Sequence, residues 1–235
     1  MKKRQLIHTD NSKKIYKSSK EGQFIVEFLD DNPFKKTKRK KISSRGECNN
    51  SVSALIFEFL ESYHVSTYFV QKSDVKEMIV EKCDPIPIKV IVRNIAWGEV
   101  CETYGIPKGK VLEYPIIEYH LKDKKRHYPF ANEYHIYALN HANPEEMKTI
   151  SKVSSKINAI LKSFFKRRGL KLVDMKLEFG KLEGKIVVCD EITTETCRIW
   201  DEHSNERYDI ETIEKKSESA DKIYKTLMEK INIVK

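Results

Sequence analysis

The segment from Leu170 to Gly180, LKLVDMKLEFG, alternates apolar and polar residues and thereby limits what this chain can fold into. Successive side chains of a β-strand point to opposite faces, so the apolar residues of this segment share one face. We expect that face to enter a core. The opposite face carries Asp174, Lys176 and Glu178. The segment therefore predicts a strand with charged groups projecting together from one side of a sheet.

A hairpin is expected after this strand, because Gly180 and Gly184 bracket residues 181–183. A three-residue turn would pair Asp174 with Asp190, so that Asp190 joins the charged face, and Glu178 with Ile186. A two-residue turn would put Asp190 on the opposite face. We predict the three-residue turn, and the position of Asp190 depends on that register.

The charged face has two interpretations. Its three carboxylates repel one another, and Lys176 offsets only part of that charge. A Mg²⁺ ion bound by one or two carboxylates and by substrate phosphates would offset the rest. Alternatively, the side chains face water at an exposed sheet edge. The sequence has no glycine-rich Walker loop or Rossmann fingerprint to favour the metal site.

The clearest helix precedes the strand and begins at NPEEMKTISKV. Asn143 is an N-cap, Pro144 suits the first helical position, and Glu146 completes a capping box. Apolar residues recur at helical spacing from Met147 onward, and Gly169 ends the helix. This helix is expected to pack in the core and to lead directly into the strand.

The other elements follow from similar patterns. Strands are predicted at KKIYKSS and Gln23–Asp31, helices at Asn50–Tyr63 and Glu218–Ile231, and two strands within Glu77–Asn94, broken at Asp84–Pro87. Because proline cannot donate to a central ladder, that break is a natural joint between lobes. It predicts a β-rich N-terminal domain over residues 1–84 and an α+β C-terminal domain over residues 85–235.

The net charge of +9 is largely local, since Lys35–Lys41 (KKTKRKK) supplies six positive charges. This run is expected to be a solvated loop, or a loop that attracts phosphate or another polyanion. It lacks interleaved aromatic residues, and no zinc-finger or RNP-type motif accompanies it. We therefore predict no nucleic-acid partner.

The five cysteines are odd in number and include no C-x-x-C motif. This pattern favours reduced, mostly buried thiols over a disulfide scaffold or a zinc site. The N-terminal segment has no apolar core of the signal-peptide type, and no run approaches the roughly 18 apolar residues of a membrane helix. We predict a soluble cytoplasmic protein without membrane contact.

Three segments together resemble SAICAR synthetase, the phosphoribosylaminoimidazole-succinocarboxamide synthase family: VDMKLEFG, CDEITTETCRIWD (Cys189–Asp201) and VIVRNIAWGEV (Val90–Val100). The resemblance implies an α+β, two-lobed fold with antiparallel sheets and packed helices, related to ATP-grasp and kinase-like folds. It implies a purine-biosynthesis ligase with ATP and Mg²⁺ as cofactors. In that reaction ATP activates the carboxylate of carboxyaminoimidazole ribonucleotide, and the aspartate amine displaces the phosphate to form SAICAR.

The resemblance also assigns roles to residues. It implies metal binding by Glu178 and Asp190, with Glu178 also at the nucleotide, and a catalytic, substrate-facing pair at Lys176 and Asp174. It implies nucleotide phosphate contacts at Lys13 and Lys122. The remaining residues that it implies are an adenine hinge at Lys82, Cys83, Asp84 and Ile86, and ribonucleotide-binding positions at Arg93, Glu99 and Arg198.

The sequence departs from the family at four places. The phosphate loop reads Asp10–Lys13, the loop after the second strand is Asp30–Phe34 with the lysine run, Glu99 replaces a phosphate-binding serine, and His127-Tyr128-Pro129 replaces His-Asp-Pro. Three functions stay open: a divergent synthetase, a paralogue joining a different carboxylate and amine, and a nucleotide-binding pseudoenzyme. The expected partners are small molecules, a ribonucleotide and an amino acid, and the resemblance implies a homo-oligomer.

Overall fold

Two antiparallel sheets organise the chain in the computed structural model, which describes residues 5–31, 42–204, 206–216 and 219–231. The first sheet has the strand order β1-β2-β3-β5-β4. Its strands are β1 (Leu6–Thr9), β2 (Lys13–Lys17), β3 (Gln23–Phe28), β4 (Phe69–Lys72) and β5 (Glu77–Glu81). The second sheet has the order β10-β9-β6-β7-β8, with β11 also paired to β9. Its strands are β6 (Asp84–Ile95), β7 (Val111–Leu121), β8 (Phe130–Ala131), β9 (Leu170–Leu182), β10 (Lys185–Cys189) and β11 (Cys197–Asp201).

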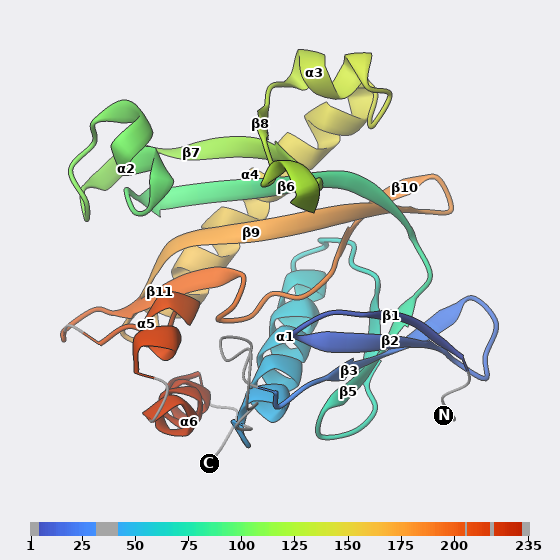
Figure 1. Cartoon of the computed structure of the whole chain (residues 1–235), viewed down its shortest axis with the longest axis horizontal. Helices are drawn as coiled ribbons and strands as arrows, with labels where there is room; N and C mark the ends of the chain where they lie inside the picture. The colour runs from blue at the N-terminus through green and yellow to red at the C-terminus, as the bar shows by residue number, and fades with distance from the viewer. Residues whose placement is uncertain (1–4, 32–41, 205, 217–218, 232–235) are drawn as a thin grey trace.

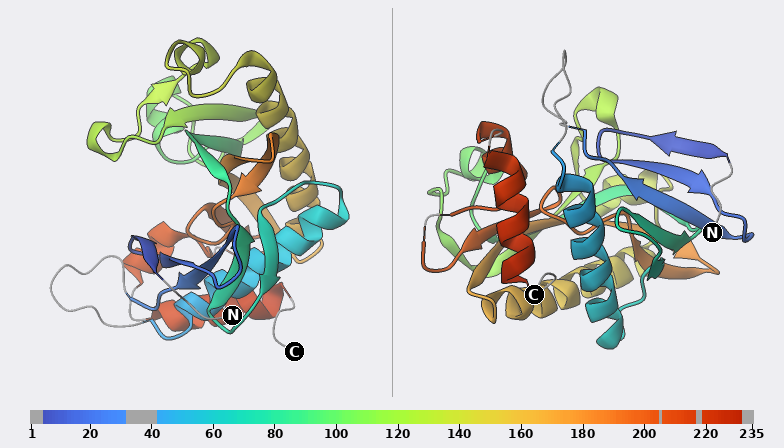
Figure 2. Two further views of the ribbon diagram at one scale, coloured as in Figure 1. Left: turned by 90° about the vertical axis from the view of Figure 1, so that its right-hand side faces the viewer. Right: turned by 90° about the horizontal axis from the view of Figure 1, so that it is seen from below.

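The helices cover these sheets (Figure 1). They are α1 (Arg45–Ser62), α2 (Glu99–Tyr104), α3 (Glu133–Ala138), α4 (Pro144–Lys166), α5 (Ile210–Lys215) and α6 (Ala220–Lys230), with a 3-10 helix at Lys124–Arg126. Helix α1 packs on β3, β4 and β5, whereas α4 packs on β9 and β6. Helix α6 lies beside α1, although the two are far apart in sequence (Figure 2). None of the helices in these residues is long and apolar enough to cross a membrane.

The predicted core helix is confirmed as α4. The Asn143 side chain accepts a hydrogen bond from the Glu146 amide at 2.9 Å, and the Glu146 carboxylate accepts one from the Asn143 amide at 2.9 Å. Gly169 has a φ of 66°, a left-handed conformation that suits glycine after a helix end. Helix α1 starts earlier than predicted, at Arg45 rather than Asn50.

The predicted break at Asp84–Pro87 is shifted, because β5 ends at Glu81 and β6 already begins at Asp84. Pro85 pairs with Gly180 of β9, and the register then slips before Lys89. Proline has no N–H group to donate to the ladder between strands. The irregular register interrupts that ladder, so β6 can contain prolines. The chain passes from the first sheet to the second between Glu81 and Asp84, close to the predicted boundary at residue 84. The division into two domains stays a prediction.

The predicted three-residue hairpin turn is wrong. Leu182 pairs with Lys185, so the turn consists of Glu183 and Gly184, with φ values of 51° and 77°. Two positive φ values match the right-handed twist of the flanking strands, which favours this turn type. In this register Cys189 lies opposite Glu178. Asp174 lies opposite Arg198 and Arg93 instead of Asp190.

Candidate active site

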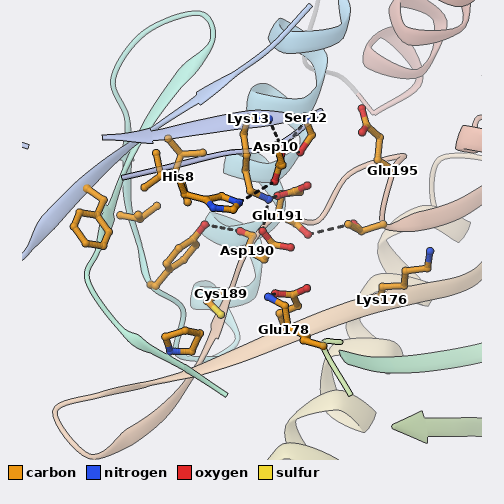
Figure 3. A pocket seen from close by; sticks show the side chains of 18 of the residues that line it. His8, Asp10, Ser12, Lys13, Lys176, Glu178, Cys189, Asp190, Glu191 and Glu195 are labelled. Atoms are coloured by element: carbon orange, nitrogen blue, oxygen red, sulfur yellow. Dashed lines mark hydrogen bonds and ion pairs between the residues drawn. The ribbon is translucent and has the colours of Figure 1, made fainter. Parts of the chain in front are cut away.

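A cleft of about 950 Å³ opens between the first sheet and the charged face of β9 (Figure 3). One wall comes from the segment that runs from β1 through β3. The opposite wall comes from β9 and from the segment that follows β10. Six of the residues predicted for the site line this cleft: Lys13, Cys83, Lys122, Lys176, Glu178 and Asp190. The fold thus gathers residues that are more than 170 positions apart in sequence.

Asp190 reaches the cleft despite the two-residue turn, contrary to our expectation for that register. Strand β10 ends at Cys189, and Asp190 adopts a left-handed backbone with a φ of 65°. This conformation redirects the chain, so strand alternation no longer fixes the side of Asp190. The Tyr68 hydroxyl donates a hydrogen bond of 2.6 Å to the Asp190 carbonyl and holds the bend. Asp190 and Glu178 therefore face the same cleft.

Lysines neutralise both carboxylates. Lys13 forms ion pairs with Asp190 and with Glu191, and Lys122 forms one with Glu178. Burial, together with the Asp190 charge, raises the pKa of Glu178. The Lys13 charge, the neighbouring Glu191 carboxyl and the Lys122 charge hold the pKa of Asp190 at about 2, against the effect of burial. The sequence reasoning missed Glu191, although its position directly after Asp190 was the available signal.

Asp174 and its arginines form a buried network at the far end of the charged face. Arg93 Nη1 lies 3.1 Å from Asp174 Oδ2, and Arg198 Nη1 lies 2.8 Å from the same oxygen. Because Asp174 is only 1% exposed, it lies beneath the arginines, whereas Lys176 lies on the cleft wall. Burial and the Arg198 charge lower the pKa of Lys176. Burial raises the pKa of Asp174 despite both arginines.

Two further acids complete this network and were not predicted. Glu118 accepts a hydrogen bond of 2.9 Å from Arg93 Nε, and Glu211 pairs with Arg198. The Trp97 indole donates to Glu211 at 3.2 Å. Only tertiary structure identifies these partners, because they lie on β7 and α5 and carry no motif. Both arginines are thus oriented from two sides before any substrate binds.

Glu99 starts α2 and is exposed. The turn before it is close to the arginines, since a Cβ at Gly98 would be 3.6 Å from Arg198 Nη2. Of the predicted hinge residues, Cys83 lines the cleft, Ile86 is buried, and Lys82 and Asp84 are exposed and do not line it.

The Asp10–Lys13 turn stands where a phosphate loop was expected. Asp10 Oδ1 accepts hydrogen bonds from the amides of Ser12 at 2.7 Å and Lys13 at 2.9 Å. Both of these amides in the turn therefore donate to the Asp10 carboxylate. The Lys35–Lys41 run lies outside the described residues.

His120 provides a test of the charged network. Its Nε2 lies 3.7 Å from Glu118 Oε2, and Nδ1 lies 2.9 Å from the Tyr128 carbonyl. The Glu118 carboxylate raises the pKa of His120 above 6.5, and burial and Arg93 oppose this only in part. The protonated imidazole therefore stabilises the fold fully below pH 6.5, and this stabilisation disappears as the pH rises through the folded-state pKa.

We expect the difference in free energy of unfolding between the wild-type protein and His120→Gln to shrink over that pH range. Urea unfolding at a series of pH values measures it. A pH-independent difference would contradict the ion pair with Glu118.

Comparisons with known proteins point to a single family. The family model described as SAICAR synthetase matches residues 6–231. The chain is 36% identical to a phosphoribosylaminoimidazole-succinocarboxamide synthase of Thermoanaerobacter sp. (strain X514) over 98% of this chain and 99% of the relative. It is 40% identical to the enzyme of that name from Chlorobium limicola, over 89% of each chain.

Solved structures extend the similarity to the fold. The crystal structure of phosphoribosylaminoimidazole-succinocarboxamide synthase from Ehrlichia chaffeensis matches with a TM-score of 0.92 and 31% identity, over 98% of this chain and 100% of that one. A SAICAR synthetase (Type-2) in complex with ADP matches with a TM-score of 0.90 and 32% identity, over 98% of this chain and 99% of that one. With its fold, its length and nearly all of its sequence matched, the chain belongs to the SAICAR synthetase family.

Proposed function

We propose that this protein is an ATP-dependent ligase of purine biosynthesis that joins aspartate to the carboxylate of carboxyaminoimidazole ribonucleotide, forming SAICAR. The observation that carries the proposal is the match to the synthetase family over residues 6–231. The existence of an ADP complex of a similar synthetase supports nucleotide binding by this chain. A carboxylate is a poor acyl donor until phosphorylation gives it a leaving group, which accounts for the use of ATP.

The cleft and the arginine network around Asp174 of β9 provide groups suited to this reaction. Lys13 and Lys122 are positioned to neutralise the nucleotide phosphates when they exchange carboxylate partners for phosphate oxygens. Arg93 and Arg198 carry guanidinium forks that match phosphate geometry, and a bound phosphate would replace some of their present bonds to Asp174, Glu118 and Glu211. The lowered pKa of Lys176 suits a group that contacts the reacting carboxylate and gives up a proton readily. These roles are part of the proposal.

The residues present fit a magnesium ion. Glu178 and Asp190 offer carboxylate oxygens, the ligand type that Mg²⁺ prefers, and burial makes their mutual repulsion costly. Among the described residues, no group of three or more His, Cys, Asp or Glu side chains could hold a metal. An ion held by these two carboxylates would take its remaining ligands from nucleotide phosphates and water. Bound there, Mg²⁺ would neutralise charge on the phosphates.

A turnover assay tests the proposal directly. The purified protein receives Mg·ATP, carboxyaminoimidazole ribonucleotide and aspartate, and both ADP and the amide product are followed. Formation of the amide with stoichiometric ADP supports the synthetase. The second candidate is a paralogue that joins a different acid and amine. Glu99 and Asp10 favour it, because they place carboxylates where phosphates are expected. ADP release only with other acid–amine pairs would favour that paralogue.

Mg·ATP is expected to stabilise the protein. At a hundredfold excess over its Kd, a ligand that binds only the folded state adds about 2.7 kcal/mol to the free energy of unfolding. Thermal unfolding with and without Mg·ATP measures the shift, and MgCl₂ alone is the control. An unchanged Tm at saturating nucleotide would contradict nucleotide binding and leave the catalytic proposal without support.

Replacing Glu99 with serine is expected to lower the KM for the ribonucleotide. Removing one like-charge contact with phosphate is worth about 1 kcal/mol in water, or roughly fivefold. Glu102→Ser is the matched control, because Glu102 lies on the same short helix with a side chain that is 76% exposed. An equal KM in both variants would place the phosphate elsewhere.

A further inference from the structure

The cleft contains a pair of cysteines that the proposed reaction does not use. Cys83 lies in the connection between β5 and β6, where the chain passes from one sheet to the other. A Cβ atom at Gly180 would be 2.7 Å from Cys83 Sγ and 3.2 Å from Cys83 Cβ. Because Gly180 has no side chain, the Cys83 side chain can lie directly over β9 at this point.

Cys189 approaches the same place from the other side of β9. Cys189 pairs with Glu178, and Val187 pairs with Gly180. Directly opposed residues of an antiparallel pair project from the same face, so Cys189 shares the cleft face with Glu178 and is a diagonal neighbour of Gly180. Figure 3 shows Cys189 beside Glu178 and Asp190. The strand register thus brings both thiols to the space that Gly180 leaves by having no side chain.

The two thiols lie close together on the cleft wall, on either side of Gly180. The neighbouring Cys189 thiol lowers the pKa of Cys83. Cys83 is partly exposed and lines the cleft, so a reagent in solution can reach it. Cys189 and the other three cysteines are buried, so Cys83 is the thiol that a reagent meets first. Burial raises the pKa of Cys48, and it raises the pKa of Cys197 to about 12. An accessible thiol beside a second thiol is the arrangement of redox-sensitive cysteines.

We propose that Cys83 and Cys189 form a reversible disulfide on reaction with a low-molecular-weight disulfide such as glutathione disulfide. The Cys83 thiolate attacks one glutathione sulfur, and a glutathione thiolate leaves. The Cys189 thiolate then attacks the Cys83 sulfur of the mixed disulfide and displaces the second glutathione. The two protein thiols lose two electrons and two protons, and one glutathione disulfide becomes two glutathione molecules.

The disulfide would tie the connection between the sheets to the end of β10, one residue before Asp190. Both sulfurs line the cleft, so a nucleotide that occupies it covers them. This consequence rests on the proposed function. Nucleotide binding is expected to protect the thiols, and the disulfide is expected to weaken nucleotide binding to the same degree, because thermodynamic coupling is reciprocal.

The test is oxidation of the full-length protein with glutathione disulfide, followed by intact-mass measurement and peptide mapping. We expect a loss of two hydrogen atoms per chain, a linked peptide pair containing Cys83 and Cys189, and full reversal by dithiothreitol. Cys83→Ser and Cys189→Ser should each abolish this species. Cys101→Ser should retain it, because Cys101 belongs to a separate small core cluster.

Several results would overturn the proposal: a disulfide that persists in Cys83→Ser, a stable mixed disulfide with glutathione as the only product, or no reaction of native protein at a large excess of oxidant. Oxidation in the presence of nucleotide distinguishes a failure of this proposal from a failure of the proposed function. Mg·ADP at a hundredfold excess over its Kd should slow oxidation by up to about a hundredfold. Disulfide formation that Mg·ADP leaves unchanged would support the thiol pair and contradict the placement of the nucleotide.

Discussion

Glu178→Gln is expected to lower kcat/KM for amide formation by about a hundredfold or more, the scale seen when a preorganised charge at a phosphoryl-transfer site is lost. Glutamine keeps the shape of the side chain but lacks the negative charge with which Glu178 forms ion pairs to Lys122 and Lys89. It is also a weaker ligand for Mg²⁺ than a carboxylate is. Steady-state kinetics with saturating aspartate measures the effect.

A matched control lies on the same hairpin. Glu183→Gln makes the same chemical change at the exposed turn between β9 and β10, outside the cleft, and should leave kcat/KM unchanged. Asp190→Asn should act as Glu178→Gln does, and both variants should lose the stabilisation by Mg·ATP. If both bind Mg·ATP normally and turn over at the wild-type rate, the assignment of these two carboxylates is wrong.

Arg45→Met is expected to destabilise the protein by about 3–5 kcal/mol, the usual effect of removing one partner from a buried ion pair. Arg45 is fully buried, and its Nε and Nη2 atoms lie 2.7 and 2.8 Å from the two carboxylate oxygens of Glu195. Its Nη1 also lies within 3.1 Å of the carbonyl oxygens of Asn11, Leu29 and Asp31. Methionine fills much of the volume but removes the guanidinium donors from these acceptors.

Urea unfolding measures this loss, and Arg126→Met is the control. Arg126 pairs with Asp123 through a side chain that is 77% exposed, and replacing it should change the free energy of unfolding by less than about 0.5 kcal/mol. Equal effects of the two substitutions would show that the buried network contributes no more than a surface ion pair. Because Arg45 also holds the carbonyl of Asn11, its loss is expected to raise the KM for ATP.

Elements with local determinants were predicted well from the sequence. Helix α4 begins at the residues that cap it, because Asn143 and Glu146 satisfy each other's amides within one turn. Strand β9 presents Lys176 and Glu178 on one face, because alternation of side chains is a property of an extended backbone. Resemblance to the family then identified which of these side chains belong to a site.

Other features required the folded chain. The hairpin register and the left-handed backbone at Asp190 together decided that Asp190 meets Glu178, whereas either of two turn lengths fitted the sequence. The pairing of Arg45 with Glu195 joins residues that are 150 positions apart. Contacts between such distant residues depend on how the sheets pack, and no local pattern encodes them.

The sequence by itself therefore determined elements with strong local patterns, such as α4 and β9, and which face of β9 is charged, because these properties depend on neighbours within a few positions. Only the tertiary structure decided which charges meet across the cleft, which arginines are enclosed, and that Cys83 and Cys189 converge on Gly180. The physical reason is that burial and pairing depend on three-dimensional packing, which brings together groups that are far apart along the chain.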